Sequence, residues 1–290
     1  MKNFKMLAAT IVVGLSMSGC VSTMQRPVAP KVQTPIYAIK YSPNSMNMPM
    51  GTTTLDESSL AIRQSGAGDG AGVMVATVGF GVIGVLAAQA IMQSQTKESI
   101  TYVDRLKNVN MPQYAFHAMD TLAKEKKLIP LLKPVNHIVE GERYEVRPFL
   151  YFEADEKHQH ELLVILRVAQ LDRSNKEKWL GQYVKHIHVA DIKSLSDETY
   201  LHTTIGSAVQ ESVDIFNQDM KGLLKKDEKK KVTIKVKDSI MFEEGIFAGW
   251  ILPSSDQQRT LYQGAMDPSA IQGGIHILET SRVEEIKPCN

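Results

Sequence analysis

The residues best placed to do chemistry in this sequence are three closely spaced glycines followed by a distant carboxylate. The segment Gly79-Phe80-Gly81-Val82-Ile83-Gly84 has the spacing G-x-G-x-x-G. In a dinucleotide site the first glycine forms a tight turn, the second lets the backbone approach a pyrophosphate, and the third lets the next helix pack closely. Asp104 lies 20 residues beyond Gly84, near the spacing expected for a carboxylate that binds ribose. An alternative function is therefore a dinucleotide-binding oxidoreductase, with the candidate cofactor-binding residues Gly79, Gly81, Gly84 and Asp104.

The sequence around these glycines argues against the oxidoreductase. A doubly wound dinucleotide fold needs continued alternation of strands and helices, because parallel strands are joined only by crossovers. After Asp104 the sequence predicts one helix, several consecutive strands and then one more helix. The run from Gly66 to Gly72 is also a poor start for a buried strand, since glycine weakens strands. We therefore expect no cofactor.

The same glycines belong to an uncharged apolar segment. As one helix, Ala71 to Met92 is long enough to cross the hydrocarbon core of a bilayer. Small residues recur every fourth position, interrupted only by Phe80, and would let another helix approach closely; they are Gly68, Gly72, Ala76, Gly84 and Ala88. This pattern resembles the glycine zipper of bacterial envelope lipoproteins, which implies a self-packing or membrane-associated helix over residues 71–95. A helix buried within the folded domain is the other interpretation.

Histidines are the other candidate for chemistry. His158 and His160 fall in a predicted turn, whereas His186 and His188 lie on one face of a predicted strand, because side chains alternate along a strand. Four imidazoles would suffice for Zn²⁺ or Cu²⁺ if the two pairs met. Nothing in the sequence brings them together, so we expect no metal site. The sequence also has neither a G-x-S-x-G nor an H-E-x-x-H motif, so we expect no enzyme.

The N-terminus has the pattern of a signal peptide. Lys2 and Lys5 precede a short apolar core from Met6 to Leu15. The segment Met17-Ser18-Gly19-Cys20 then resembles the lipobox of bacterial lipoproteins. The resemblance implies that residues 1–19 are removed and that Cys20 carries the acyl chains, such as palmitate, that anchor the protein. Val21 stands where an aspartate would favour the inner membrane, so the resemblance implies the periplasmic face of the outer membrane.

Composition limits the possible partners. The chain of 290 residues has 33 basic and 32 acidic residues and a formal charge of +1. No global field therefore favours nucleic acid. There are two cysteines, and a lipidated Cys20 leaves Cys289 without a partner in the chain.

Periodicity predicts the folded part of the chain. Two amphipathic helices, 112–127 and 197–223, flank antiparallel strands at 144–152, 162–171 and 179–189. The predicted fold class is α+β, a two-layer sandwich of an antiparallel sheet and two helices, preceded by the apolar Gly-rich helix and followed by a small β-rich unit. The expected divisions are a signal peptide at 1–19, a lipidated flexible tether at 20–70, the Gly-rich helix at 71–95, an α+β periplasmic domain at 96–224, a charged hinge at 225–231 and the β-rich unit at 232–290.

These features predict a lipoprotein of the outer membrane that acts as a structural or assembly component of the cell envelope. An accessory of secretion, of a pilus or of transport is one form of that role. The expected partners are membrane lipid, through Cys20, and either envelope proteins or further copies of this chain. No nucleic-acid partner is expected.

Overall fold

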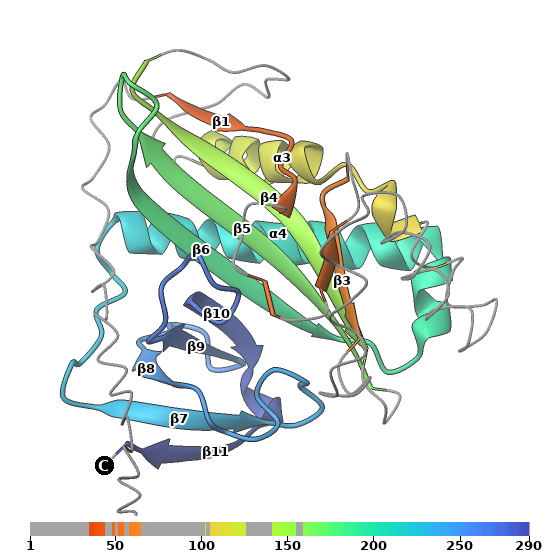
Figure 1. The fold of residues 1–290 in the computed structure, drawn as a ribbon, viewed down its shortest axis with the longest axis vertical. Coiled ribbons are helices and arrows are strands. Elements are labelled where there is room, and N and C mark those ends of the chain that lie inside the picture. The colour runs from red at the N-terminus through yellow and green to blue at the C-terminus, as the bar shows by residue number, and fades with distance from the viewer. Residues whose placement is uncertain are drawn as a thin grey trace, which may run out of the picture.

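The computed structural model describes residues 35–43, 48–49, 52–54, 58–64, 102, 105–125, 141–154 and 159–289 (Figure 1). Several candidate residues lie outside these ranges. They are Cys20, the small residues from Gly68 to Ala88, the glycines of the G-x-G-x-x-G motif, Asp104 and His158. The signal peptide and the Gly-rich helix also lie outside the described residues.

Three long strands form the centre of the fold. They are β4 (Arg143–Ala154), β5 (His160–Leu171) and β6 (Glu177–His188), and they pair antiparallel in sequence order. The turn between β5 and β6 is closed by Asp172, whose Oδ1 accepts hydrogen bonds from the backbone N–H groups of Ser174 and Lys176. Asn175 in this turn has φ 61°, a conformation that asparagine tolerates better than most residues. The three predicted strands and their antiparallel pairing are confirmed.

Two helices cover one face of these strands and lie behind the sheet in Figure 1. They are α3 (Met111–Lys124) and α4 (Glu198–Met220), and a short 3₁₀ helix, η3 (Ile192–Ser196), leads into α4. Each α-helix begins after a side chain that accepts a hydrogen bond from its first turn, Asn110 from Gln113 N–H and Asp197 from Tyr200 N–H. Both predicted helices are confirmed. Neither they nor any other helix in the described ranges is both long and apolar enough to cross a membrane.

The predicted fold class is nevertheless wrong, because the sheet is mixed and much larger than expected. It has eleven strands among the described residues, in the order β11-β7-β8-β9-β10-β6-β5-β4-β3-β2, with β1 paired to β4. β1 (Ile36–Ala38) and β3 (Leu60–Gln64) run parallel to β4, and β2 (Thr52–Thr54) pairs antiparallel with β3. These three strands fall within the expected tether, so they are sheet rather than flexible linker.

The short length of these strands and the origin of their pairing explain why the sequence does not reveal them. The three strands are three to five residues long, too short for periodicity. The pairing of β1 and β3 is set by the free side of β4, and β2 pairs with β3. Pro148 divides that side: β1 pairs with residues 144–146 and β3 with residues 150–154. A proline cannot donate a ladder hydrogen bond, so the break falls where β4 lacks a donor.

The C-terminal strands continue the same sheet, so the predicted separate β-rich unit is also wrong. β10 pairs parallel with β6, and the other strands follow outward from it. Periodicity indicates that a strand exists but not which neighbour it takes. The strands are β7 (Lys231–Val236), β8 (Ala248–Leu252), β9 (Arg259–Gly264), β10 (Gly274–Glu279) and β11 (Val283–Pro288), with a 3₁₀ helix, η4 (Thr280–Arg282), before β11.

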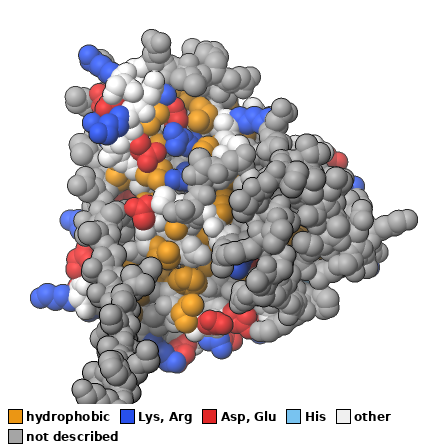
Figure 2. Space-filling view, in the orientation of Figure 1, with side chains coloured by type: hydrophobic (Ala, Val, Ile, Leu, Met, Phe, Trp, Pro, Cys, Tyr) orange, Lys and Arg blue, Asp and Glu red, His pale blue; other side chains and the backbone are white. Residues whose placement is uncertain are grey.

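Side-chain alternation gives the sheet two different faces. The face against the helices carries the larger apolar core, which includes Tyr144, Leu166 and Tyr183. The opposite face carries a second core around Phe149 and Phe242. Figure 2 views the molecule from this second side, where hydrophobic side chains are interleaved with basic and acidic ones. We call this second side the open face of the sheet, and it contains the polar clusters described next.

Candidate functional site

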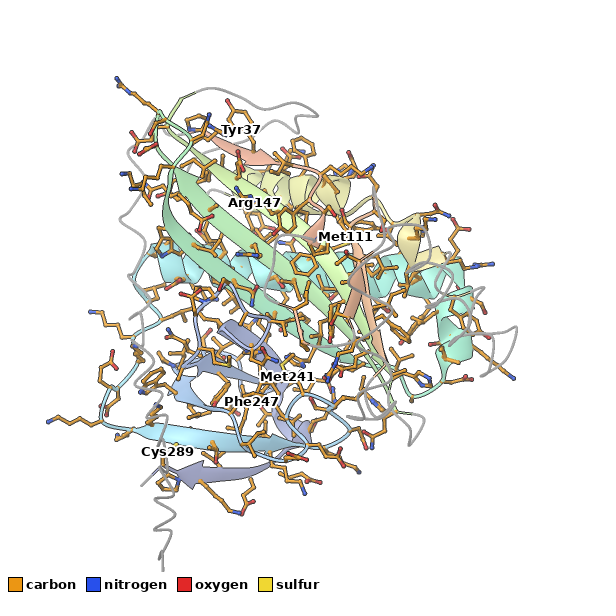
Figure 3. The ribbon with its side chains drawn as sticks, in the orientation of Figure 1. Tyr37, Met111, Arg147, Met241, Phe247 and Cys289 are labelled. Carbon is orange, nitrogen blue, oxygen red and sulfur yellow. The ribbon has the colours of Figure 1, made fainter. Side chains whose placement is uncertain are left out.

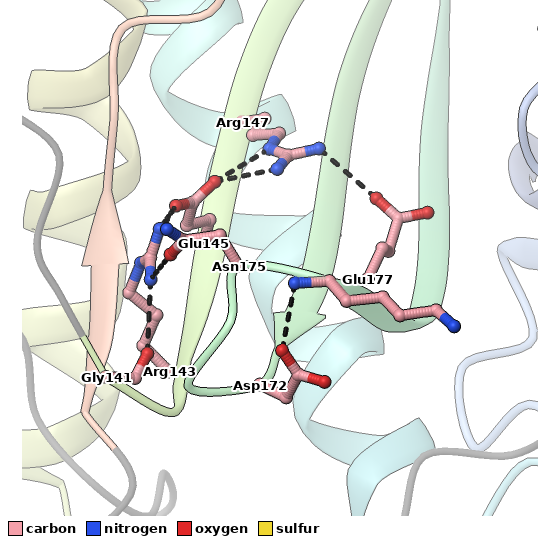
Figure 4. A network of polar contacts seen from close by, with 8 residues as sticks. Gly141, Arg143, Glu145, Arg147, Asp172, Asn175 and Glu177 are labelled. Carbon is pink, nitrogen blue, oxygen red and sulfur yellow. Dashed lines mark hydrogen bonds and ion pairs between the residues drawn. The ribbon is translucent and has the colours of Figure 1, made fainter.

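An arginine–glutamate cluster lies at one end of the open face (Figure 4). Arg143, Glu145 and Arg147 occupy alternate positions of β4, so their side chains share one face. Glu145 Oε1 accepts from Arg143 Nε at 2.9 Å and Nη2 at 2.6 Å, and its Oε2 accepts from Arg147 Nη2 at 2.7 Å. Arg143 is only 3% exposed, so this carboxylate balances a buried positive charge.

The cluster also connects separate parts of the chain. Arg143 Nη1 donates to Asn175 Oδ1 at 2.7 Å, which links the start of β4 to the β5–β6 turn. Arg147 reaches the half-exposed Glu177 at 3.4 Å. These contacts fix the end of the sheet at which β1 begins.

Tyr41 joins the segment that follows β1 to the open face. Its ring packs against Phe149 with centroids 5.8 Å apart. The guanidinium carbons of Arg147 and Arg167 lie 5.7 and 5.9 Å from its centroid, and Arg167 Nη1 donates to its hydroxyl at 3.2 Å. Burial lowers the pKa of Arg167, and the nearby Tyr41 and Glu177 oppose that change. The side chains of the sheet therefore hold residue 41 in place.

A second polar cluster is fully buried in the sheet. Its members come from β5, β6, β10 and the β7–β8 connection: Glu161, His186, His276 and Ser239. His186 Nδ1 donates to Glu161 Oε1 at 2.7 Å, and His186 Nε2 lies 2.9 Å from His276 Nδ1. His276 Nε2 in turn donates to the carbonyl of Gln272 at 3.1 Å.

Counting donors assigns the protons in this cluster. The carbonyl of Gln272 only accepts, so His276 carries its proton on Nε2. Burial, together with His186, lowers the pKa of His276 to about 3, so its Nδ1 is an acceptor. His186 thus lies between two acceptors, Glu161 Oε1 and His276 Nδ1. Burial alone would raise the pKa of Glu161, but His186 and the Ser239 hydroxyl lower it on balance, so Glu161 is a carboxylate.

The Glu161 carboxylate also holds the β7–β8 connection. Its oxygens accept from the hydroxyl of Ser239 at 3.0 and 3.2 Å and from the backbone N–H of Ile240 at 3.1 Å. Phe242 packs against both imidazoles, with centroids 5.4 Å from His186 and 5.1 Å from His276. Met241 and Phe247 of the same connection, labelled in Figure 3, pack in the second core with Phe242. The cluster thus attaches β5, β6, β10 and one connection to one another.

A third ion pair joins β3 to β4. Arg63 Nη1 lies 2.5 Å from Glu153 Oε1, and the Glu153 side chain is 2% exposed. Burial raises the pKa of Glu153 to about 7 although Arg63 opposes the rise. This carboxyl group therefore titrates near neutral pH.

The structure separates the histidines proposed for a metal. His186 and His188 share the open face, as their positions in β6 predict. His160 instead stacks on Phe152, whose side chain belongs to the core beneath the helices. His160 is therefore on the other side of the sheet from the β6 pair, and the four-histidine arrangement does not form. Within the described residues no three His, Cys, Asp or Glu side chains are grouped so that they could hold a metal ion.

Sequence reasoning did not select Glu161, Ser239 or His276. The available signal was a charged residue or a histidine inside an otherwise apolar strand, as in Glu161-Leu162-Leu163 and Ile275-His276-Ile277. A buried charge needs a partner, so each such residue predicts a second one nearby. Which residue that is depends on the parallel pairing of β10 with β6, which the sequence does not show.

The three clusters share one chemical property: their charged groups are neutralised inside the molecule and connect strands. Such arrangements fix strand order and register.

No protein-family model, curated protein or solved structure matches this chain.

Proposed function

We propose that this protein is a lipoprotein anchored through Cys20 to the periplasmic face of the outer membrane, where its sheet is a structural or assembly component of the envelope. The observation that carries the proposal is the segment Met17-Ser18-Gly19-Cys20 after a basic and then apolar N-terminus. Lipidation gives this anchoring a physical basis, because several acyl chains on one residue make membrane residence stable where one does not.

The position of β1 supports a mechanical role for the anchor. Ile36 lies 16 positions after Cys20, so the link from lipid to sheet is no longer than about 58 Å when fully extended. Backbone hydrogen bonds join this strand to β4, from Tyr144 N–H to Pro35 O at 2.8 Å and from Ile39 N–H to Val146 O at 2.9 Å. Force on the anchor would therefore pass directly into the sheet.

Crosslinking in intact cells tests the assembly role. A photoreactive amino acid would replace the exposed apolar side chains Leu223, Ile246 or Ile286, which are 59%, 62% and 50% exposed. The same substitution at the buried Phe242 is the matched control. The proposal predicts discrete adducts with envelope proteins or with further copies of this chain from at least one exposed position. Normal protein levels with no adduct from any exposed position would contradict it.

A further inference from the structure

The loop between α4 and β7 brings lysines to a single tryptophan. Residues 225–231 contain five lysines, one aspartate and one glutamate, a net charge of +3. Lys226 Nζ lies 4.1 Å from the centroid of the Trp250 ring and Lys231 Nζ lies 5.6 Å from it. The strand register explains the second contact, because Lys231 of β7 pairs with Trp250 of β8.

Hydrogen bonds within the loop hold its shape. Asp227 Oδ1 accepts from Lys229 N–H at 3.1 Å, and its carbonyl accepts from Lys230 N–H at 2.9 Å. Figure 3 shows Cys289 at the end of β11 beside the start of β7, and its N–H donates to the carbonyl of Lys231 at 2.9 Å. The end of the lysine cluster at Lys231 is thus fixed to the sheet.

The positive charge of this cluster is only partly neutralised within the described residues. Lys226 pairs with Glu228 at 2.9 Å, and Lys230 lies 3.4 Å from Asp227. Lys226 and Lys231 lie at most about 10 Å apart, because both are over one ring. That separation is no more than about one Debye length at 0.1 M salt, so the two ammonium groups repel each other. An anion between them would relieve the repulsion.

Trp250 also carries a hydrogen-bond donor that an anion could satisfy. Trp250 is 7% exposed, and within the described part of the chain its indole Nε1–H has no hydrogen-bond acceptor. Buried donors are normally paired, and an unpaired one costs about 1–3 kcal/mol. The same ring therefore has two ammonium groups near it and one unsatisfied donor. All three suit the oxygens of a phosphate group.

We propose that Trp250, Lys226 and Lys231 form a binding site for a phosphate group, and that the phosphate belongs to the headgroup of an anionic membrane lipid. The choice of lipid rests on the proposed function, which keeps the sheet close to a bilayer. Leu223, 59% exposed and two residues before Lys225, adds an apolar side chain beside the basic ones, a combination suited to a lipid surface.

Lysine acetylation, read by mass spectrometry on the lipidated full chain, tests this site. The protein would be reconstituted in vesicles of phosphatidylcholine alone or with phosphatidylglycerol. We expect Lys226 and Lys231 to react at least about fivefold more slowly in the anionic vesicles, while the exposed Lys107 and Lys193 change less than twofold. Equal rates in the two kinds of vesicle would overturn the proposal, as would equal protection of Lys107 and Lys193.

One further arm of the experiment distinguishes the source of the phosphate from the existence of the site. Inorganic phosphate, added to the protein in neutral detergent at constant ionic strength, should also slow acetylation of Lys226 and Lys231. If it does so while anionic vesicles do not, the assignment to lipid is wrong. Because this arm needs no bilayer, it reports on the site even if Cys20 proves not to anchor the protein.

Trp250→Phe tests the indole donor, since it keeps a ring beneath the lysines and removes the N–H. Trp179→Phe is the matched control, because Trp179 is also 7% exposed. Among the residues that the structure describes, its Nε1–H has no acceptor and no lysine lies over its ring. We expect protection to fall at least twofold in Trp250→Phe and to be unchanged in Trp179→Phe. Equal protection in both variants would show that the indole N–H does not bind phosphate.

Discussion

His186 donates a hydrogen bond to Glu161 across neighbouring strands, 2.7 Å from Nδ1 to Oε1, with both side chains at most 1% exposed. Glu161 is the carboxylate of this pair, and His276 is neutral and accepts from the other nitrogen of His186. The centre of the sheet therefore contains a buried carboxylate and a buried histidine that the folded protein keeps uncharged. This arrangement makes the stability of the fold depend on pH.

His276 should weaken the fold as the pH is lowered. Its pKa is about 3 in the folded protein and 6.5 ordinarily, so between these values the unfolded chain binds a proton that the folded protein excludes. The free energy of unfolding should fall by up to about 1.4 kcal/mol per pH unit below pH 6.5. His276→Gln keeps a donor and an acceptor but does not titrate, so it should remove this part of the slope. Denaturant unfolding between pH 4 and 7 measures it, and equal slopes for the two proteins would refute a neutral His276.

Glu153 should act in the opposite direction. Its pKa is about 7 in the folded protein and 4.5 ordinarily, so between these values the folded protein binds the extra proton. Its contribution to stability therefore grows as the pH falls from 7 to 4.5. Glu153→Gln should be at least as stable as the wild type at pH 8 and should lose stability more steeply on acidification. A shallower slope than that of the wild type would contradict this expectation.

Glu161→Gln is the informative comparison for Glu153→Gln. Both residues are buried glutamates, but the pKa of Glu161 is lowered by the folded structure whereas that of Glu153 is raised. Glu161→Gln removes the carboxylate that accepts from His186, the Ser239 hydroxyl and the Ile240 N–H, which should cost about 2 kcal/mol or more at pH 8. Similar stabilities for the two glutamine variants at that pH would show that the two sites do not differ as described.

Glu145 should matter far more than Glu177 to the cluster at the end of the sheet. Glu145→Gln leaves the buried Arg143 without its carboxylate and should destabilise the protein by about 3 kcal/mol. Glu177→Gln removes a contact of 3.4 Å from a side chain that is 42% exposed, and should cost less than about 1 kcal/mol. Urea unfolding measures the loss of stability in both variants. Equal losses would mean that burial does not set the strength of these pairs.

Sequence patterns predicted the elements whose periodicity is long enough to read. The strands β4, β5 and β6 are twelve residues each, and α4 has apolar residues along one stripe from Leu201 to Phe216. Their types and approximate limits follow from side-chain alternation and capping residues. The short turn at Asp172 also made their antiparallel pairing predictable.

Long-range pairing could not be predicted in the same way. β1 and β3 join β4 from across about a hundred residues, and β10 joins β6 from beyond α4. Hydrogen-bonding groups along a strand edge are the same for every partner, so sequence alone does not choose among them. The buried cluster of Glu161, His186 and His276 depends on these pairings and was missed for that reason.

The mass and location of the protein after Cys20→Ser test the central proposal most directly. Wild-type protein from cell membranes should begin at Cys20, carry the added mass of its acyl chains and fractionate with the outer membrane. The variant should lose the acyl mass and keep residues 1–19, because the proposed cleavage depends on the modified cysteine. A wild-type protein without acyl mass, or a Cys20→Ser variant with the same processing and location as the wild type, would contradict the lipoprotein assignment.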